Sequence, residues 1–176
     1  MNKPLMIIII YFFAVFFLSR LFIPNLGFKK GKLPNKIPKE FEKIINQIKK
    51  KSKNKEYFAI NIYNYLSNRF YSKPLSTWTN FNSLFIKDMN KLWQRKLLHC
   101  HQLNNFYRIF LIKSKFFKEE DIKIIHKFCM FNIHQYLKIK INNKSVKVDL
   151  FAKNLGYKFG EALPYLYNPF KSKNDI

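Results

Sequence analysis

Cysteine and acidic residues are both scarce in this chain of 176 residues. It contains 2 cysteines and 10 aspartates and glutamates, against 33 lysines and arginines and 4 histidines. A zinc site assembled from cysteine pairs is not supported, because the sequence has no CxxC pair. The histidines and cysteines between positions 99 and 134 offer another ligand set, but residues 99, 100 and 101 of one helix do not all aim at one ion. We therefore expect neither a metal nor a cofactor.

Recognisable nucleic-acid-binding motifs are also lacking, although the formal net charge of +23 invites such a partner. A basic chain with 18% aromatic residues could follow phosphates with lysine and stack bases on its rings. Few of the basic residues are arginine, however, and the lysines are spread over nearly every segment. The accompanying excess of Asn, Ile, Phe and Tyr is the bias expected of an AT-rich genome. We therefore expect no nucleic-acid partner.

The N-terminus holds one long apolar run. Every residue from Leu5 to Leu18 is apolar, and the run continues past Ser19 and Arg20 to Ile23. This length is enough to cross a bilayer when the arginine near its end extends to the interface. No small-x-small cleavage site follows the run. We expect residues 1–24 to form an uncleaved single-pass anchor in the cell membrane; a cleavable signal peptide and a buried core helix are the alternatives.

Lysines crowd the C-terminal flank of the apolar run, at positions 29, 30, 32, 36 and 39. By the positive-inside rule, the residues that follow would lie in the cytoplasm. The general excess of lysine weakens this rule here, so the sequence leaves the side of the membrane open. Prolines and glycines mark residues 25–38 as a linker, and we expect residues 39–176 to form one domain.

This domain is predicted to be α+β, with a helical first half and an antiparallel hairpin. Helical patterns and loop signals predict its other elements. We expect helices over 39–51, 56–70 and 81–93, a helix that begins near Cys100, a short helix over 119–128, an edge strand at 128–131 and an irregular tail over 155–176.

Cys100 is a candidate nucleophile. The residues that follow it carry apolar side chains at positions 103, 106, 107, 110 and 111, which is helical spacing. Cys100 therefore lies in the first turn of a predicted helix, where unpaired N–H groups and the helix dipole favour an anion and lower a thiol pKa. The thiolate is the form that attacks an electrophile. The alternative role for Cys100 is that of a small buried apolar residue.

Residues 135–150 have the pattern of a β-hairpin. Polar and apolar residues alternate over 135–141 and 144–150, and Asn142 and Asn143 suit the positive φ angles of a two-residue turn. Such a turn pairs position 141 with 144 and, continued outward, places 136 opposite 149 and 134 opposite 151. The face expected to point to the core then consists of apolar side chains: Leu137, Ile139, Ile141, Val146, Val148 and Leu150.

His134 and Asp149 share the opposite face of this hairpin. In the predicted register they are diagonal neighbours, roughly 7–8 Å apart at Cα, which allows a hydrogen bond between imidazole and carboxylate. A one-residue slip would separate them. The carboxylate would fix the ring while the other ring nitrogen reaches the thiol of Cys100. The sequence therefore predicts a Cys100–His134–Asp149 triad; a solvated histidine and an aspartate that ends a strand are the alternative.

The segment from His134 to Asp149, with Cys100 at the head of the preceding helix, resembles the transglutaminase-like family. That family has a His-Ala-Trp sequence, a hairpin turn and an aspartate in this order, and residues 56–160 are similar to its core. The resemblance implies a papain-like fold and an enzyme that acts on amide or peptide bonds of a peptide or protein through an acyl-enzyme, with hydrolysis favoured over transfer.

Catalysis of this kind needs donors for the oxygen of the tetrahedral intermediate. The backbone N–H of Cys100 is the first candidate. Gln94, six residues before the cysteine, is a second, at a spacing similar to that of the glutamine of papain. The alternative function is a catalytically inactive, membrane-tethered binding module of the same fold. The sequence leaves the oligomeric state open.

Overall fold

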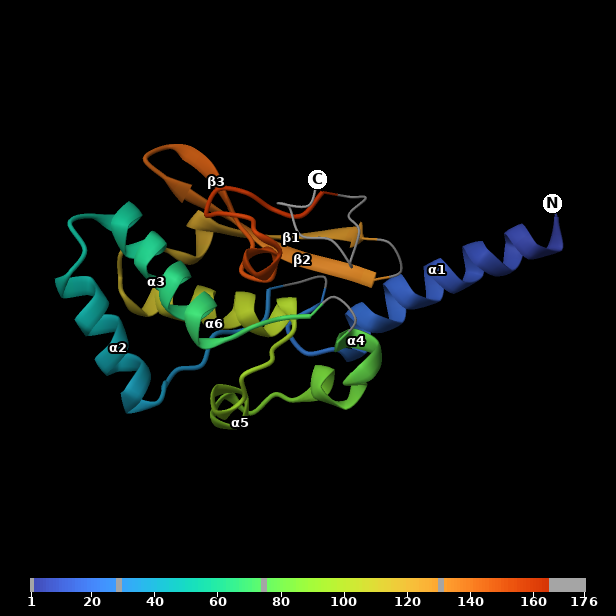
Figure 1. Cartoon of the computed structure of the whole chain (residues 1–176), viewed down its shortest axis with the longest axis horizontal. Coiled ribbons are helices and arrows are strands. Elements are labelled where there is room, and N and C mark those ends of the chain that lie inside the picture. Colours follow the sequence, from blue (N-terminus) through green and yellow to red (C-terminus); the bar gives the residue numbers. More distant parts are fainter. Residues whose placement is uncertain (1, 28–29, 74–75, 130–131, 165–176) are drawn as a thin grey trace.

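The computed structural model describes residues 2–27, 30–73, 76–129 and 132–164 (Figure 1). The fold is α+β, as predicted: a helical first half and a small antiparallel sheet follow one apolar N-terminal helix. The helices are α1 (Lys3–Phe22), α2 (Lys39–Lys50), α3 (Lys55–Arg69), α4 (Ser76–Thr79), α5 (Met89–Gln94) and α6 (Cys100–Lys113). Three 3-10 helices, η1 (Phe81–Phe85), η2 (Glu119–Asp121) and η3 (Ala152–Leu155), accompany the strands β1 (Ile122–Cys129), β2 (Asn132–Ile141) and β3 (Lys144–Val148).

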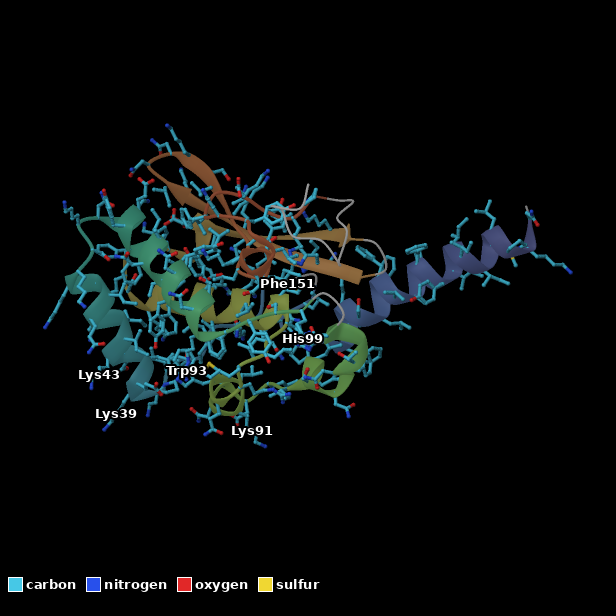
Figure 2. The ribbon with its side chains drawn as sticks, in the orientation of Figure 1. Lys39, Lys43, Lys91, Trp93, His99 and Phe151 are labelled. Atoms are coloured by element: carbon cyan, nitrogen blue, oxygen red, sulfur yellow. The ribbon has the colours of Figure 1, made fainter. Side chains whose placement is uncertain are left out.

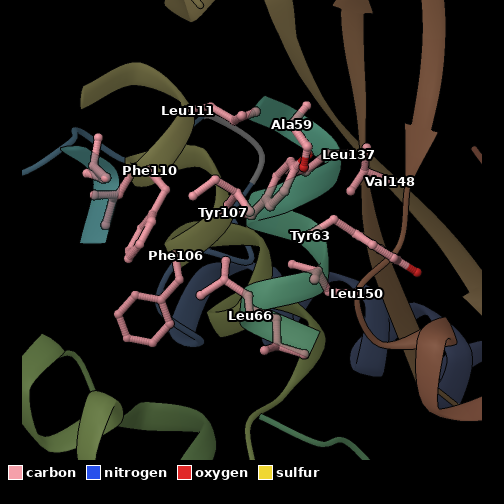
Figure 3. Packing of buried hydrophobic residues seen from close by; sticks show 14 of the residues in the cluster. Ala59, Tyr63, Leu66, Phe106, Tyr107, Phe110, Leu111, Leu137, Val148 and Leu150 are labelled. Carbon is pink, nitrogen blue, oxygen red and sulfur yellow. The ribbon is translucent and has the colours of Figure 1, made fainter. Parts of the chain in front are cut away.

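Helix α6 forms the centre of the folded part. Ten of its 14 residues are buried, and it packs against β2, α3 and α2. Figure 3 shows Phe106 and Tyr107 of this helix among side chains of α3 and of the sheet. Burial of one such ring contributes roughly 2 kcal/mol, and the Tyr107 hydroxyl also donates to the carbonyl oxygen of Ala59, 2.9 Å away. The helix that begins at Cys100 is therefore fixed from several sides.

The predicted helices over 39–51 and 56–70 are confirmed as α2 and α3. The Asn54 side chain begins α3 by accepting hydrogen bonds from two backbone N–H groups of the first turn. The predicted helix over 81–93 is wrong, because this stretch forms η1 and then α5. Asp88 caps α5 in the same way, so a separate helix begins after Asp88, within the range predicted as one continuous helix.

The predicted helix over 119–128 is also wrong. Only Glu119–Asp121 form a helical turn, and Ile122–Cys129 form strand β1, which pairs with β2. Its isoleucines favour a strand, and pairing with β2 satisfies its backbone. The edge strand predicted at 128–131 lies partly outside the described residues, and so does the tail beyond residue 164.

The hairpin is confirmed. Ile141 pairs with Lys144, and Asn142 and Asn143 have φ angles of 47° and 62°. Five of the six side chains of the predicted core face are buried, and Val146 is half-buried. The predicted outward continuation is wrong, because the ladder between β2 and β3 ends at Leu137 and Val148.

Helix α1 extends away from the rest of the chain (Figure 1). None of its residues is buried, and it is long and apolar enough to cross a membrane. The segment that follows, through residue 38, has no helix or strand among its described residues. It is attached to α6 by Arg108, whose guanidinium donates to the carbonyl oxygen of Gly31 over 2.7 Å and pairs with Glu119 at 2.6 Å.

Candidate active site

Cys100 is the first residue of α6, as predicted. His99 precedes the helix as its N-cap residue, and Gln102 accepts a hydrogen bond from the His99 backbone N–H over 3.1 Å. The Cys100 side chain is half-exposed. It therefore combines the electrostatic environment of a helix start with access to solvent, which an attacking thiol requires.

His134 and Asp149 form a buried hydrogen-bonded pair. The His134 Nε2–H donates to Asp149 Oδ2 over 2.7 Å, and the two residues are 4% and 1% exposed. Asp149 reaches this position from the turn after β3, not from a paired strand position. Its carboxylate also accepts from the backbone N–H groups of Ala152 and Leu163, each over 3.1 Å. Three donors thus hold the carboxylate in one orientation.

Cys100 lies close enough to the His134 ring to contribute to its electrostatic environment. Because Nε2 is occupied by Asp149, the nitrogen toward Cys100 is Nδ1. The structure therefore brings together the three residues of the predicted triad.

The charge of Asp149 controls the protonation of His134. Burial alone would lower the pKa of His134, but the Asp149 charge and the hydrogen bonds to Asp149 and Cys100 raise it to about 10. The imidazole is thus protonated at neutral pH, with one N–H directed at the carboxylate.

A cluster of neutral polar side chains fixes the start of α6. His99 Nε2 lies 2.6 Å from Ser83 Oγ, and Gln102 donates from Nε2 to the Ser83 carbonyl oxygen over 2.7 Å. Figure 2 shows where His99 lies in the fold. Burial lowers the pKa of His99 to about 4, and burial together with His99 lowers that of His101 to about 3. Both rings are neutral at pH 7 and act as hydrogen-bonding groups.

Asn104 ties α6 to the strand that carries His134. Its side-chain amide donates to the Gln135 carbonyl oxygen over 2.7 Å and lies 3.3 Å from Gln135 Oε1. Both residues are buried. This contact fixes the distance between α6, which carries Cys100, and β2, which carries His134. The sequence analysis missed it, because nothing in the local pattern distinguishes Asn104 from a solvent-facing asparagine.

An apolar wall borders the site, built from the segment after Asp149. Phe151, Ala152 and Leu163 form a small cluster against which Cys100 packs, together with Leu155 and Tyr157. The centroids of the Phe151 and His134 rings lie 5.2 Å apart, and Figure 2 labels Phe151. Part of this segment was predicted as irregular tail, and the only local signal for the wall was its apolar residues. The wall shields the histidine–aspartate pair from water on this side.

Gln94 does not join the site among the described contacts. It is the last residue of α5, and its side chain is exposed to solvent. The described residues also contain no group of three or more potential metal ligands. The backbone N–H of Cys100, at the first position of α6, has no intrahelical acceptor and remains a candidate donor for an oxyanion.

No protein-family model, curated protein or solved structure matches this chain. What the site can do is therefore inferred from its own geometry.

Proposed function

We propose that this protein is a membrane-anchored cysteine enzyme with a transglutaminase-like core, which acts on an amide or peptide bond of a peptide or protein. One observation carries the proposal: His134 is hydrogen-bonded to Asp149 and lies close enough to Cys100, at the start of a helix, to interact with it electrostatically. A buried carboxylate, an imidazolium and a half-exposed thiol in this order are the parts of an activated nucleophile.

The chemistry follows from the protonation states. The Cys100 thiolate attacks the carbonyl carbon of the substrate, and the backbone N–H of Cys100 stabilises the oxyanion. The protonated His134 then gives its Nδ1 proton to the leaving amine, and a thioester to Cys100 remains. The neutral imidazole next takes a proton from water, which attacks the thioester and releases the acid. An amine in place of water would give transfer; we favour hydrolysis.

The N-terminal helix supports the membrane anchor in this proposal. A helix of 20 residues is about 30 Å long, which matches the hydrocarbon thickness of a bilayer. Its side chains from Leu5 to Leu18 are all apolar, and no residue of the helix is buried, although Arg20 near its end lies 3.3 Å from His126 Nδ1. The side of the membrane on which the folded part lies stays open.

A generic acyl donor tests the proposal without knowledge of the substrate. The purified full-length protein is incubated with p-nitrophenyl acetate, and the modified residue is identified by peptide mass spectrometry. We expect a burst of p-nitrophenol, one acetyl group on Cys100 and its slow loss to water. The Cys100→Ser variant serves as the blank, and a Cys129→Ser variant confirms that the second cysteine is not responsible.

The alternative is an inactive binding module of the same fold. It predicts no burst, and acetylation of Cys100 no faster than that of a free cysteine at the same pH.

A further inference from the structure

Two phenylalanines of η1 are exposed side by side. Phe81 and Phe85 are 54% and 40% exposed, and their ring centroids lie 5.3 Å apart in an edge-to-face arrangement. Among the described residues outside α1, they are the only exposed phenylalanines. Two adjacent exposed rings form a small apolar patch, the kind of surface feature from which contact with a partner or a membrane is inferred.

Contacts place this pair close to the end of the apolar helix α1. Asn25, three residues after that helix, accepts a hydrogen bond from Gln135 over 2.9 Å. Asn25 and His101 line the same small cavity, and His101 Nε2 lies 3.3 Å from the carbonyl oxygen of Leu84, within η1. Figure 1 draws α4, which immediately precedes η1, at the C-terminal end of α1.

The end of α1 is apolar and exposed, as the pair of phenylalanines is, and lysines flank that pair. Leu21 and Phe22, the last residues of α1, are 66% and 67% exposed. The exposed Lys73 and Lys87 flank η1 on either side, and one exposed acid, Asp88, follows Lys87 and caps α5. Exposed aromatic rings with flanking lysines are the chemistry that binds the headgroup region of an anionic membrane.

We infer that Phe81 and Phe85 form a lipid-contacting surface, whose rings enter the headgroup region of the same membrane that α1 spans. The inference rests on the proposed membrane anchor and goes beyond it by giving the folded part a fixed orientation. Anionic headgroups face Lys73 and Lys87, and the rings lie at the level of the glycerol groups and the first carbons of the acyl chains.

This surface is connected directly to the candidate nucleophile. Ser83 and Leu84, between the two rings, contact the three residues next to Cys100 through the hydrogen bonds of His99, His101 and Gln102. The contact with lipid therefore holds Cys100 at a fixed height above the membrane. Substrates that are themselves attached to or resting on the membrane are the class that this placement favours.

Site-directed fluorescence in vesicles tests the inference. The full chain, with Cys100→Ser and Cys129→Ser, is reconstituted in vesicles of phosphatidylcholine and phosphatidylserine. Single cysteines are introduced as Phe81→Cys or Phe85→Cys and labelled with an environment-sensitive dye. Quenching by lipids that carry a nitroxide near the headgroup is measured. Tyr57→Cys on α3 is the matched control, because Tyr57 is 51% exposed and lies on another helix, and Phe22→Cys reports on the anchor.

We expect dyes at 81, 85 and 22 to be quenched several-fold more than the dye at 57. If the dye at position 22 is quenched but the dyes at positions 81 and 85 are quenched no more than the dye at position 57, the lipid contact is overturned and the anchor is not. No quenching at 22 would overturn the anchor and the inference with it. Dyes at 81 and 85 that are shielded from aqueous iodide but unaffected by nitroxide lipids would show that protein covers the surface, which also overturns the inference.

Discussion

Asp149 is the residue on which the geometry of the site depends most. Its carboxylate receives three hydrogen bonds while it is 1% exposed, and it orients the ring of His134. Its charge also offsets the effect of burial on that ring. A single residue thus controls both the position and the proton of the candidate base.

Replacing Asp149 by asparagine keeps the size of the side chain and removes the charge. Without that charge, burial dominates, and we expect the pKa of His134 to fall from about 10 to below its ordinary value of 6.5. The change is measured by NMR titration of the ring in protein labelled at histidine. Asp121→Asn, in the exposed η2, is the control and should leave the titration unchanged. An unaltered pKa in Asp149→Asn would contradict the role given to the carboxylate.

The raised pKa of His134 also makes stability depend on pH. The folded state keeps a proton up to about pH 10, whereas the unfolded state releases it near 6.5. This stabilisation is complete below pH 6.5 and is lost as the pH rises toward 10, by at most about 1.4 kcal/mol per pH unit. Urea unfolding of the wild type and of His134→Gln across this range should give curves that converge as the pH increases. Parallel curves would show that His134 is not protonated in the folded state.

At the scale of elements, the site depends on how α6 is fixed to β2 and η1. Asn104 joins α6 to β2, and His99 and Gln102 join it to η1. These contacts connect positions far apart in the sequence, such as 104 and 135. They are all buried, so each side chain must find a partner in the fold.

Asn104→Ala removes the side chain that joins α6 to β2 and leaves the carbonyl oxygen of Gln135 without its donor. We expect a loss of about 1–3 kcal/mol in the free energy of unfolding, the usual cost of a buried group left unsatisfied. We also expect slower alkylation of Cys100 at neutral pH, because His134 moves relative to the thiol. Both are measured on one preparation, by urea unfolding and by iodoacetamide labelling. Asn105→Ala, next along the helix and half-buried, is the control.

The hairpin could be predicted from the sequence and the packing between elements could not. Alternation over 135–150 and the Asn142-Asn143 turn determine the register locally, so the core face was found. The end of the ladder was missed, because Asp149 is drawn into the turn by the N–H groups of Ala152 and Leu163. Strand β1 was not predicted, because the local pattern of its isoleucines is also compatible with a short helix. Only its pairing with β2 distinguishes the two. Three local signals were enough to select Cys100, His134 and Asp149 as candidates, whereas the contact of Asn104 with Gln135 became apparent only from the fold.

The whole molecule combines an apolar helix with a folded part that contains buried neutral histidines. Burial lowers the pKa of His99 to about 4, and burial with the neighbouring ring lowers that of His101 to about 3. Burial together with the charge of Arg20 lowers that of His126 to about 4. Each of these rings must take up a proton when the chain unfolds in acid.

The molecule should therefore lose stability as the pH falls below 6.5. Below pH 6.5 the unfolded state binds protons at these rings and the folded state does not. The free energy of unfolding therefore decreases by up to about 1.4 kcal/mol per pH unit for each ring. We expect the unfolding temperature to fall steeply between pH 6.5 and 4. His99→Gln, which keeps a polar side chain near Ser83, should flatten this dependence, and Lys91→Gln on the surface should not. Equal slopes for both variants would contradict the assignment of neutral buried rings.

The anchor is tested on the intact protein in membranes. A charge at the middle of a spanning helix costs about 3 kcal/mol, so Phe13→Arg should move a large share of the protein from the alkali-resistant membrane fraction to the soluble fraction. Phe13 is 63% exposed, so the substitution leaves the core unchanged. Tyr57→Arg, on the folded part, should not alter the distribution.

The pH dependence of Cys100 alkylation tests the active triad most directly. Full-length protein with Cys129→Ser is labelled with iodoacetamide between pH 5 and 10, beside the same protein with His134→Gln. An activated pair predicts rapid labelling that persists well below pH 8 and slows in the variant. Labelling with an apparent pKa near 8.5, the ordinary value of a thiol, and no effect of His134→Gln would contradict the proposed enzyme. The inactive binding module would then be the favoured function.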